Sequence, residues 1–228
     1  MFTDGLISLF FPNLCLACGS REIYTGAVLC IKCQHKLPQT QFHFQKDNAF
    51  TQRFWGRLPL FSGAALFRFT KGGHVQHLIH QLKYKGKKEV GIKVGEFYGR
   101  LLMKSPLFSA IDLIIPVPLH SKKKHIRGYN QSSMIAKGLS KSMEKPWLDK
   151  GLLRIEFSDT QTRKSRMDRL DNVSRAFVVG DSKRLKGKHI LLVDDVITTG
   201  ATLESCGLKI LEVPNTRLSM LTLAIANV

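Results

Sequence analysis

A short apolar run that ends in two acids is the feature that most constrains how this chain folds. Residues 190–193 are Ile-Leu-Leu-Val, and Asp194 and Asp195 follow them directly. An apolar run of this length is typical of a strand that is buried on both faces of a parallel sheet. A helical pattern begins at Leu203, so the segment predicts a buried strand, a tight turn and a helix.

The turn between this strand and helix is rich in hydroxyl groups. Its sequence over residues 198–202 is Thr-Thr-Gly-Ala-Thr. Backbone N–H groups point outward where a helix begins, and the helix dipole favours negative charge there. Gly200 lets the backbone approach an anion closely, and the threonine hydroxyl groups add donors. The two acids would repel that anion, so we expect them to face sugar hydroxyls, a metal ion or both. An anion site beside such acids predicts the binding of a phosphorylated sugar.

Other proteins share part of this pattern. Two acids after an apolar strand also occur in receiver domains and in ordinary α/β turns, so the acids alone are weak evidence. The threonine-rich turn is what favours the phosphosugar interpretation. Two competing phosphate-binding motifs, G-x-x-x-x-G-K-[ST] and G-x-G-x-x-G, do not occur in the sequence.

Four of the five cysteines form two C-x-x-C pairs near the N-terminus. Each pair can form a tight knuckle, and two knuckles make a tetrahedral sulfur site for zinc. Disulfides and a redox C-x-x-C are the alternatives, but disulfides are rare in cytosolic chains and two pairs this close favour a metal. Four thiolates leave no open position on the ion, so we expect a structural site. The expected zinc ligands are Cys15, Cys18, Cys30 and Cys33.

Two histidines and the fifth cysteine remain to be placed. His35 and His43 are alternative ligands, although four cysteines already complete the site. Cys206 follows the helical spacing of Leu203 and Ile210. We therefore expect Cys206 to be a buried core thiol and not a nucleophile.

The composition limits the partners and the location of the protein. The formal net charge is +18, from 35 Lys and Arg residues against 17 acids. This charge favours a polyanionic ligand, either nucleic acid or a phosphorylated metabolite, and a generally basic solvated surface is the alternative. No apolar run approaches the length of a membrane span, and the short run at residues 7–11 follows an acid, not a basic segment. We expect a packing helix there, no membrane insertion and a cytoplasmic location.

Apolar periodicity predicts an α/β fold in which helices flank a parallel sheet. Besides the central strand, strands are expected at residues 65–69, 111–115, 176–179 and 218–225. Helices are expected at residues 75–82 and 90–101, around Ile135 and Leu139, and after the threonine-rich turn.

A connector at residues 39–58 mixes aromatic residues with arginines. We expect its aromatic side chains to pack the cysteine module onto the sheet domain, and stacking on single-stranded bases is the alternative. The expected division is a zinc-binding module and connector at residues 1–50 and the larger domain at residues 51–228.

Two segments of the chain are basic: the first follows an expected strand, and the second precedes one. Residues 122–131 follow a strand that ends in Pro-Val-Pro at 116–118, and we expect a basic loop that binds an anion through its side chains. A solvated lysine run is the alternative, and it suits residues 122–124 better than residues 127–131. Residues 161–177 are basic with few apolar positions, which predicts a mobile loop that closes over substrate.

Taken together, these motifs resemble the ComF family (ComFC/GntX-like proteins), whose members carry a type I phosphoribosyltransferase domain. Residues 190–202 are similar to the loop that binds 5-phosphoribosyl-1-pyrophosphate (PRPP) in such domains: a hydrophobic strand, two acids and T-G-x-T. The resemblance covers nearly the whole chain. It also rests on the four cysteines, residues 82–84, 116–118 and 127–131, and Gln161 with Arg169 and Asn172.

The resemblance implies a zinc module fused to a type I phosphoribosyltransferase fold. It implies that Mg-PRPP binds with its 5-phosphate at the Thr-Gly turn, its ribose hydroxyls at the two acids and its pyrophosphate near residues 118–127. It also implies a role in the handling of incoming single-stranded DNA by competent bacteria, beside a helicase-like competence protein. The implied ions are structural Zn2+ and the Mg2+ that accompanies PRPP.

These expectations define the candidate site. The candidate catalytic residues are Asp194, Asp195 and Arg127. The candidate PRPP-binding residues are Lys83, Pro118, Asp194, Asp195, Thr198, Thr199, Gly200, Ala201 and Thr202.

Three functions remain open at this point. The first is an active phosphoribosyltransferase with an unknown acceptor; Thr198 stands where some purine enzymes of this type carry an acid, so no built-in base for a purine is expected. No glutaminase activity is expected either, because the chain begins Met1-Phe2 and lacks an N-terminal cysteine nucleophile. The second is a non-catalytic protein that handles single-stranded DNA and uses the fold as a phosphate-binding scaffold. The third is a zinc-ribbon transcription factor, although no segment resembles a recognition helix.

Overall fold

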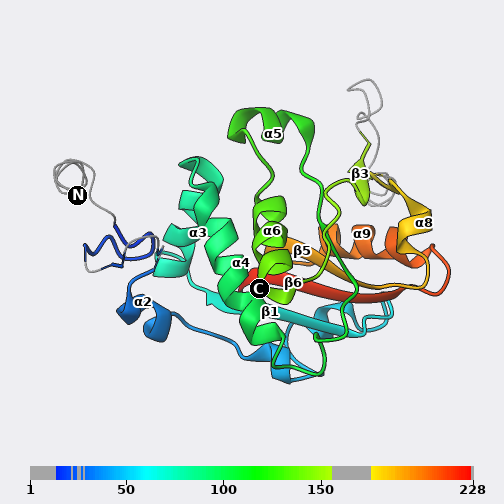
Figure 1. Ribbon diagram of the computed structural model, residues 1–228, viewed down its shortest axis with the longest axis horizontal. Helices are drawn as coiled ribbons and strands as arrows, with labels where there is room; N and C mark the ends of the chain where they lie inside the picture. Colours follow the sequence, from blue (N-terminus) through cyan, green and yellow to red (C-terminus); the bar gives the residue numbers. More distant parts are fainter. Residues whose placement is uncertain (1–13, 22, 25–26, 28, 156–175, 227–228) are drawn as a thin grey trace.

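The computed structural model describes residues 14–21, 23–24, 27, 29–155 and 176–226 (Figure 1). The short helix expected at residues 7–11 lies outside these ranges, and so does nearly all of the basic loop expected at residues 161–177. Among the described residues, no helix is both long and apolar enough to cross a bilayer.

The centre of the molecule is a four-stranded parallel sheet, which confirms the expected fold class. Its strands are largely buried, because helices and the connector cover them. The order from edge to edge is β1 (Ser62–Phe69), β6 (Arg217–Ala226), β5 (His189–Ile197) and β2 (Leu113–Pro116).

Strand β5 is longer than the sequence predicted. We expected it to end at the two acids, but its pairing with β6 continues past them, with Val196 opposite Ala224 and Ile197 opposite Ile225. Val196 and Ile197 are apolar and β-branched, so they extend the strand and pack on the pleated surface. The acid pair therefore lies inside a strand, where alternate side chains point to opposite faces.

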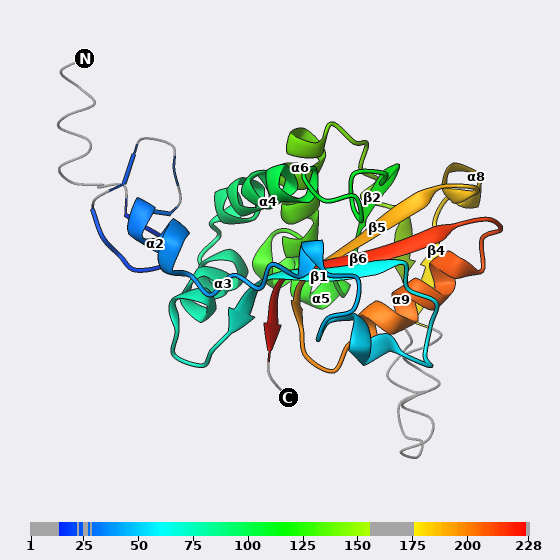
Figure 2. The same ribbon diagram turned by 90° about the horizontal axis from the view of Figure 1, so that it is seen from below.

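The expected helices are present and cover both faces of the sheet. Helices α4 and α6 lie together on one side, and α9 lies on the other (Figure 2). On α3 the predicted apolar face, from Val75 to Leu82, is buried as expected. The four long helices are α3 (His74–Tyr84), α4 (Lys88–Leu102), α6 (Gln131–Met143) and α9 (Ala201–Leu211).

Glycines set the distance between α4 and α6. On α4, Gly91, Gly95 and Gly99 recur every four residues and face α6. A Cβ atom at Gly95 would lie 2.5 Å from the Ile135 carbonyl oxygen, and one at Gly138 would lie 2.0 Å from the Ile92 carbonyl oxygen. The backbones of the two helices touch directly, which places the start of α6 beside β5.

The basic segment after β2 is a helix and not the expected loop. Helix α5 (Ser121–Arg127) begins where the His120 side chain accepts a hydrogen bond from the Lys122 amide, and it ends at Gly128, whose φ is 74°. Both ends therefore carry local helix-terminating features. No residue of α5 is buried, and Figure 1 shows the helix projecting from the body of the molecule.

The remaining elements are short. In the connector, Phe42, Phe50 and Phe54 are buried, as the packing interpretation predicted, whereas Phe44 and Trp55 are exposed. The proposed domain boundary near residue 50 stays a prediction. The short elements are α2 (Ile31–Lys36), η1 (Phe42–Phe44), η2 (Thr51–Phe54), the antiparallel pair β3 (Leu152–Arg154) and β4 (Phe177–Val179), and α8 (Ser182–Leu185).

Candidate functional site

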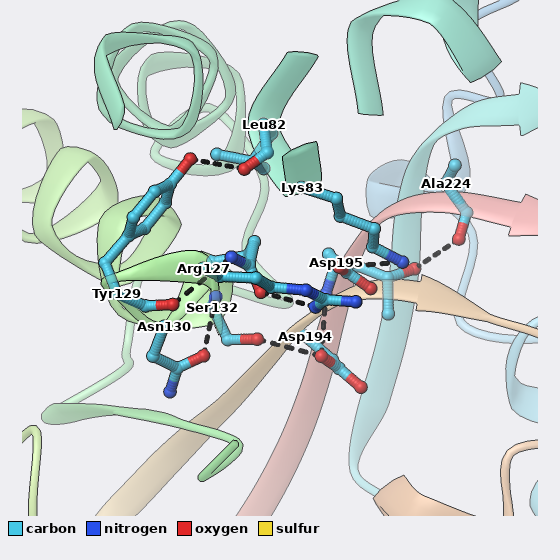
Figure 3. A network of polar contacts seen from close by, with 11 residues as sticks. Leu82, Lys83, Arg127, Tyr129, Asn130, Ser132, Asp194, Asp195 and Ala224 are labelled. Carbon is cyan, nitrogen blue, oxygen red and sulfur yellow. Dashed lines mark hydrogen bonds and ion pairs between the residues drawn. The ribbon is translucent and has the colours of Figure 1, made fainter. Parts of the chain in front are cut away.

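The predicted phosphosugar residues gather at the carboxyl edge of the sheet. Asp194 and Asp195 on β5 lie below the ends of α3 and α5 and beside the start of α6 (Figure 3). Ligands of open α/β sheets bind at this edge, because strands end and helices begin there. Elements far apart in the sequence thus contribute to one site.

Asp194 is held by two hydrogen-bond donors. Ser132 Oγ, in the first turn of α6, donates to Asp194 Oδ1 over 2.8 Å, and the backbone N–H of Asp195 donates to the same oxygen over 2.8 Å. Burial, followed by the neighbouring charge of Asp195, raises the pKa of Asp194 to about 7, although both donors oppose the change. Asp194 therefore holds a proton more readily than an exposed aspartate does.

Asp195 is paired with a cation from another element. Lys83 Nζ, in the last turn of α3, lies 3.0 Å from Asp195 Oδ2 (Figure 3). Both side chains are mostly buried, with exposed fractions of 23% for Lys83 and 13% for Asp195. The two acids are therefore unequal: one faces a serine hydroxyl group and the other faces an ammonium group.

The threonine-rich turn forms the start of α9. Gly200 is its N-cap, with a φ of 85° that other residues rarely adopt, and a Cβ atom there would lie 3.1 Å from the Phe54 ring. Gly200 has no side chain to cap this helix start, and the Ala201 amide donates only a long hydrogen bond of 3.5 Å to Thr199 Oγ1. Thr198, Thr199, Ala201 and Thr202 are exposed around it. An uncapped helix N-terminus with surrounding hydroxyl groups is suited to hold a phosphate.

An arginine from the connector also reaches this turn. Arg57 donates to the Thr199 carbonyl oxygen over 3.4 Å and forms a two-armed ion pair with Glu204, with one arm at 3.0 Å. Glu204 lies in the first turn of α9, so its charge would repel a phosphate unless it were neutralised. This role of Arg57 was not predicted from the sequence, because Arg57 is about 140 residues away from its partners and no local motif marks it.

Arg127 and Pro118 stand at the outer part of the site. Arg127 Nη1 donates to Gln131 Oε1 over 2.8 Å, and its guanidinium group lies over the Tyr84 ring, 5.3 Å from the centroid. Pro118 is partly exposed after β2. Arg127 is thus held above the acid pair by neighbours on α3 and α6, not by the acids themselves.

Ser132 is the site residue that the sequence could have revealed. It follows Asn130 and Gln131, which the motif analysis had already singled out, and it lies in the first turn of a predicted helix. Ser132 was nevertheless not predicted, because helical register alone does not show that this turn faces β5. Only the close α4–α6 packing, together with the contact of α6 with β5, fixes that orientation.

The four N-terminal cysteines form one cluster. Their sulfur atoms all lie within 4.8 Å of one another, and Cys18 Sγ is 3.7 Å from Cys30 Sγ. A tetrahedral site with Zn–S bonds of about 2.3 Å requires sulfur atoms about 3.8 Å apart, whereas a disulfide requires about 2.05 Å. Burial would raise the pKa of Cys15, but backbone N–H groups, led by that of Cys30, lower it to about 6. The cluster fits a tetrahedral metal ion.

The two histidines and the fifth cysteine lie outside this cluster. His43 is buried in the connector with its ring edge-on to Tyr98, 5.7 Å away, and His35 is exposed. Neither belongs to the cysteine cluster. Cys206 is fully buried in α9, and burial raises its pKa well above the ordinary value, which confirms the prediction of an inert core thiol.

Part of the chain matches a known family model. A family model described as "Phosphoribosyl transferase domain" matches residues 130–212, which contain Ser132, the acid pair and the threonine-rich turn. Among solved structures, the chain is similar to a glutamine PRPP amidotransferase from B. subtilis, with a TM-score of 0.43 and 17% identity over 62% of this chain and 30% of that chain. A similarity that low carries no conclusion about activity.

Curated relatives match much more of the chain. The "DNA utilization protein YhgH" of Shigella flexneri is 30% identical over 198 residues, which are 83% of this chain and 80% of that protein. The "Competence protein F" of Haemophilus influenzae is 40% identical over 40% of this chain and 41% of its own length. The "Competence protein ComFC" of Bacillus subtilis is 30% identical over 44% and 38%. The chain therefore belongs to the ComF family of proteins with a phosphoribosyltransferase domain.

Proposed function

We propose that this protein binds Mg-PRPP at the edge of the sheet and transfers its phosphoribosyl group to an acceptor, in a process that handles incoming DNA. The observation that carries the proposal is the arrangement of the acid pair beside an uncapped, hydroxyl-rich helix start. Anion-binding and hydroxyl-binding groups are adjacent there, as a phosphorylated sugar requires. The DNA role rests on the relatives' names, "DNA utilization protein" and "Competence protein".

Each part of the substrate has a matching group. The 5-phosphate would bind the amides and hydroxyl groups of residues 198–202, with Arg57 holding the turn in place. The ribose hydroxyls would bind Asp194 and Asp195, and the pyrophosphate would extend past Pro118 toward Arg127. Lys83 must turn away from Asp195, or share that carboxylate, when the ribose binds.

The proposed reaction exchanges one bond at the ribose. The bond between C1 of the ribose and the pyrophosphate oxygen breaks, and the pyrophosphate leaves with the electron pair. A nucleophilic atom of the acceptor then bonds to C1. Arg127 and Lys83 supply positive charge that stabilises the departing pyrophosphate, while the acids favour the positive character that develops on the ribose.

The cysteine cluster is proposed to hold a structural Zn2+ ion. The 3.7 Å sulfur separation and the four-sulfur donor set support zinc, and a complete thiolate set leaves no position for substrate. When bound, the ion would fix the fold of the N-terminal module.

The first experiment is a calorimetric titration of Mg-PRPP into the zinc-loaded protein. We expect saturable binding that is lost in the double variant Asp194→Asn/Asp195→Asn, because the amides cannot replace both charged acceptors. Asp149→Asn is the matched control, since Asp149 is an exposed acid that accepts a hydrogen bond from Ser133 on the same helix as Ser132. Equal binding by the double variant and the wild type would refute the site.

A second candidate function is the binding of single-stranded nucleic acid without turnover. The observation that favours it is a basic and aromatic surface at the ends of α3 and α5, which we call the α3–α5 tip. Tyr84 is 61% exposed beneath Arg127, and Ile126 is 81% exposed. Exposed aromatic rings among cations can stack bases and follow a phosphate backbone. The tip consists of Tyr84, Lys85, Lys87, Lys122, Lys123, Lys124, Ile126 and Arg127.

A binding titration with a labelled oligo(dT) at several salt concentrations tests this candidate. We expect affinity to fall with salt, and Tyr84→Ala combined with Lys122→Ala and Lys123→Ala to weaken binding at least tenfold, about 1.4 kcal/mol. Replacement of Lys183, Arg184 and Lys186 by alanine is the control, because these residues are exposed around α8 and their loss removes one more positive charge than the tip variant does. Equal losses in the two triple variants would assign the binding to net charge and not to the tip.

A further inference from the structure

The N-terminal end of helix α3 contacts the cysteine cluster. His74 Nδ1 and His77 Nδ1 lie 3.0 Å and 3.1 Å from the carbonyl oxygen of Ala17. Ala17 is fully buried between the two cysteines of the first C-x-x-C pair. A carbonyl oxygen has two lone pairs and only accepts, so both histidines donate to it.

A hydrogen bond from Gln81 determines the tautomer of His77. Gln81 Nε2 lies 3.0 Å from His77 Nε2. A side-chain amide nitrogen only donates, so His77 Nε2 accepts and the ring proton resides on Nδ1. His77 therefore donates to the Ala17 carbonyl oxygen through Nδ1 and accepts from Gln81 through Nε2.

The other end of α3 is tied to the proposed phosphosugar site. Three consecutive residues each have a partner there, and Figure 3 shows the partners of the first two, Leu82 and Lys83. The Tyr129 hydroxyl group donates to the Leu82 carbonyl oxygen, and Lys83 pairs with Asp195 over 3.0 Å. Arg127 lies over the ring of the next residue, Tyr84.

Between these ends the helix is continuous. Its buried face packs against β1 and α4, and α3 contains no proline or glycine. Nine residues separate His74 from Lys83, so the two anchored ends are about 14 Å apart at 1.5 Å per residue. A shift of the N-terminal end is therefore carried to Lys83 as a movement of one rigid body.

We propose that His74 and His77 are positioning residues that couple metal binding in the cysteine cluster with phosphosugar binding at the acid pair. The proposal rests on the proposed function of that pair. An ion in the cluster fixes the first cysteine pair and with it the direction of the Ala17 carbonyl. Two hydrogen bonds then hold α3 in the position that places Lys83 beside the acid pair, from where its side chain can turn to the pyrophosphate when the ribose binds. Because both ligands favour one position of α3, each must strengthen the binding of the other by the same factor.

The test measures this factor in both directions. Metal-free protein is prepared with a thiol-protecting reductant, freed of chelator and titrated with Mg-PRPP before and after reloading. Co2+ serves as the metal probe, because its thiolate absorption reports cluster occupancy without any assay of activity. In the wild type we expect Mg-PRPP to bind about 5–150-fold more weakly without metal, and saturating Mg-PRPP to tighten Co2+ binding by the same factor.

Three variants separate coupling from folding. In His74→Leu/His77→Leu each ligand still binds, but the factor falls to about one, because neither side chain can donate. His74→Asn/His77→Asn should restore the factor, since the asparagine amide nitrogen takes the place of Nδ1. His80→Leu is the matched control on the same helix: His80 contacts Tyr84 and not Ala17, so the factor should remain. A factor equal to that of the wild type in the leucine double variant would overturn the proposal.

Hydrogen exchange keeps this test separate from the proposed function. If Mg-PRPP does not bind the metal-loaded wild type, the proposed function fails, and coupling is then read from the amides of residues 82–84. We expect metal removal to speed their exchange in the wild type, and the leucine double variant to exchange fast even when loaded. Faster exchange in the cysteine module alone, with residues 82–84 unchanged, would refute the coupling.

Discussion

Ser132 on α6 donates a hydrogen bond of 2.8 Å to Asp194 on β5, across 62 residues of sequence. This contact holds one oxygen of the acid and leaves the other available to a ligand. It does not offset burial and the nearby charge of Asp195, since the pKa of Asp194 remains raised to about 7. The pKa of Asp194 therefore lies close to neutral pH.

The first prediction concerns the pH dependence of stability. Between the ordinary pKa of 3.8 and about 7, folded Asp194 keeps a proton that the unfolded chain has lost. The stability from this group is thus complete below pH 4 and is lost as the pH rises through about 7. The variant Asp194→Asn lacks this dependence, so its free energy of unfolding relative to the wild type should rise from pH 4 to pH 8 in urea titrations. A constant difference between the variant and the wild type over this pH range would contradict the assignment.

The second prediction concerns the α4–α6 contact. A Cβ atom at Gly138 would meet the Ile92 carbonyl oxygen at 2.0 Å, and backbone cannot move aside as a flexible side chain can. Gly138→Ala should therefore lower the free energy of unfolding by about 1–3 kcal/mol, despite the better helix propensity of alanine. Urea unfolding measures the loss. Lys137→Ala, at the neighbouring exposed position, should change it by less than about 0.5 kcal/mol.

The third prediction concerns Arg57 and the threonine-rich turn. Arg57→Ala removes both the ion pair with Glu204 and the contact with the Thr199 carbonyl oxygen. Exposed ion pairs contribute about 0–1 kcal/mol, so stability should change little. Binding of Mg-PRPP should weaken severalfold, because the Glu204 charge then faces the phosphate. Calorimetry on Lys209→Ala provides the comparison, since Lys209 forms an exposed pair with Glu212 on the same helix but away from the turn.

The fourth prediction concerns the metal content. The purified protein should carry one zinc ion per chain, and Cys30→Ser should lower the zinc content or greatly weaken its retention against a chelator. Cys206→Ala should keep its zinc, because Cys206 is buried in α9 outside the cluster. Elemental analysis measures the zinc content of the wild type and of the Cys30→Ser and Cys206→Ala variants. Full zinc retention in the Cys30 variant would remove the cluster from consideration as the site.

Local patterns in the sequence determined much of this protein. The apolar run before Asp194, the turn around Gly200 and the face of α3 each form from neighbouring residues, so periodicity and turn chemistry sufficed to predict them. The two C-x-x-C pairs predicted the cysteine cluster for the same reason. Where local signals competed, the prediction was wrong: the basic segment after β2 is the helix α5, because its ends are capped by His120 and Gly128.

Tertiary structure alone decided which distant groups meet. Nothing local places Ser132 on Asp194, Lys83 on Asp195 or Arg57 at the threonine-rich turn. These contacts depend on the close approach of α4 and α6 and on the strand order β1-β6-β5-β2, which are set by packing over the whole core. The sequence predicted the two acids and the threonine-rich turn. Only the tertiary structure showed which side chains contact them, because no local pattern encodes the proximity of side chains across a core.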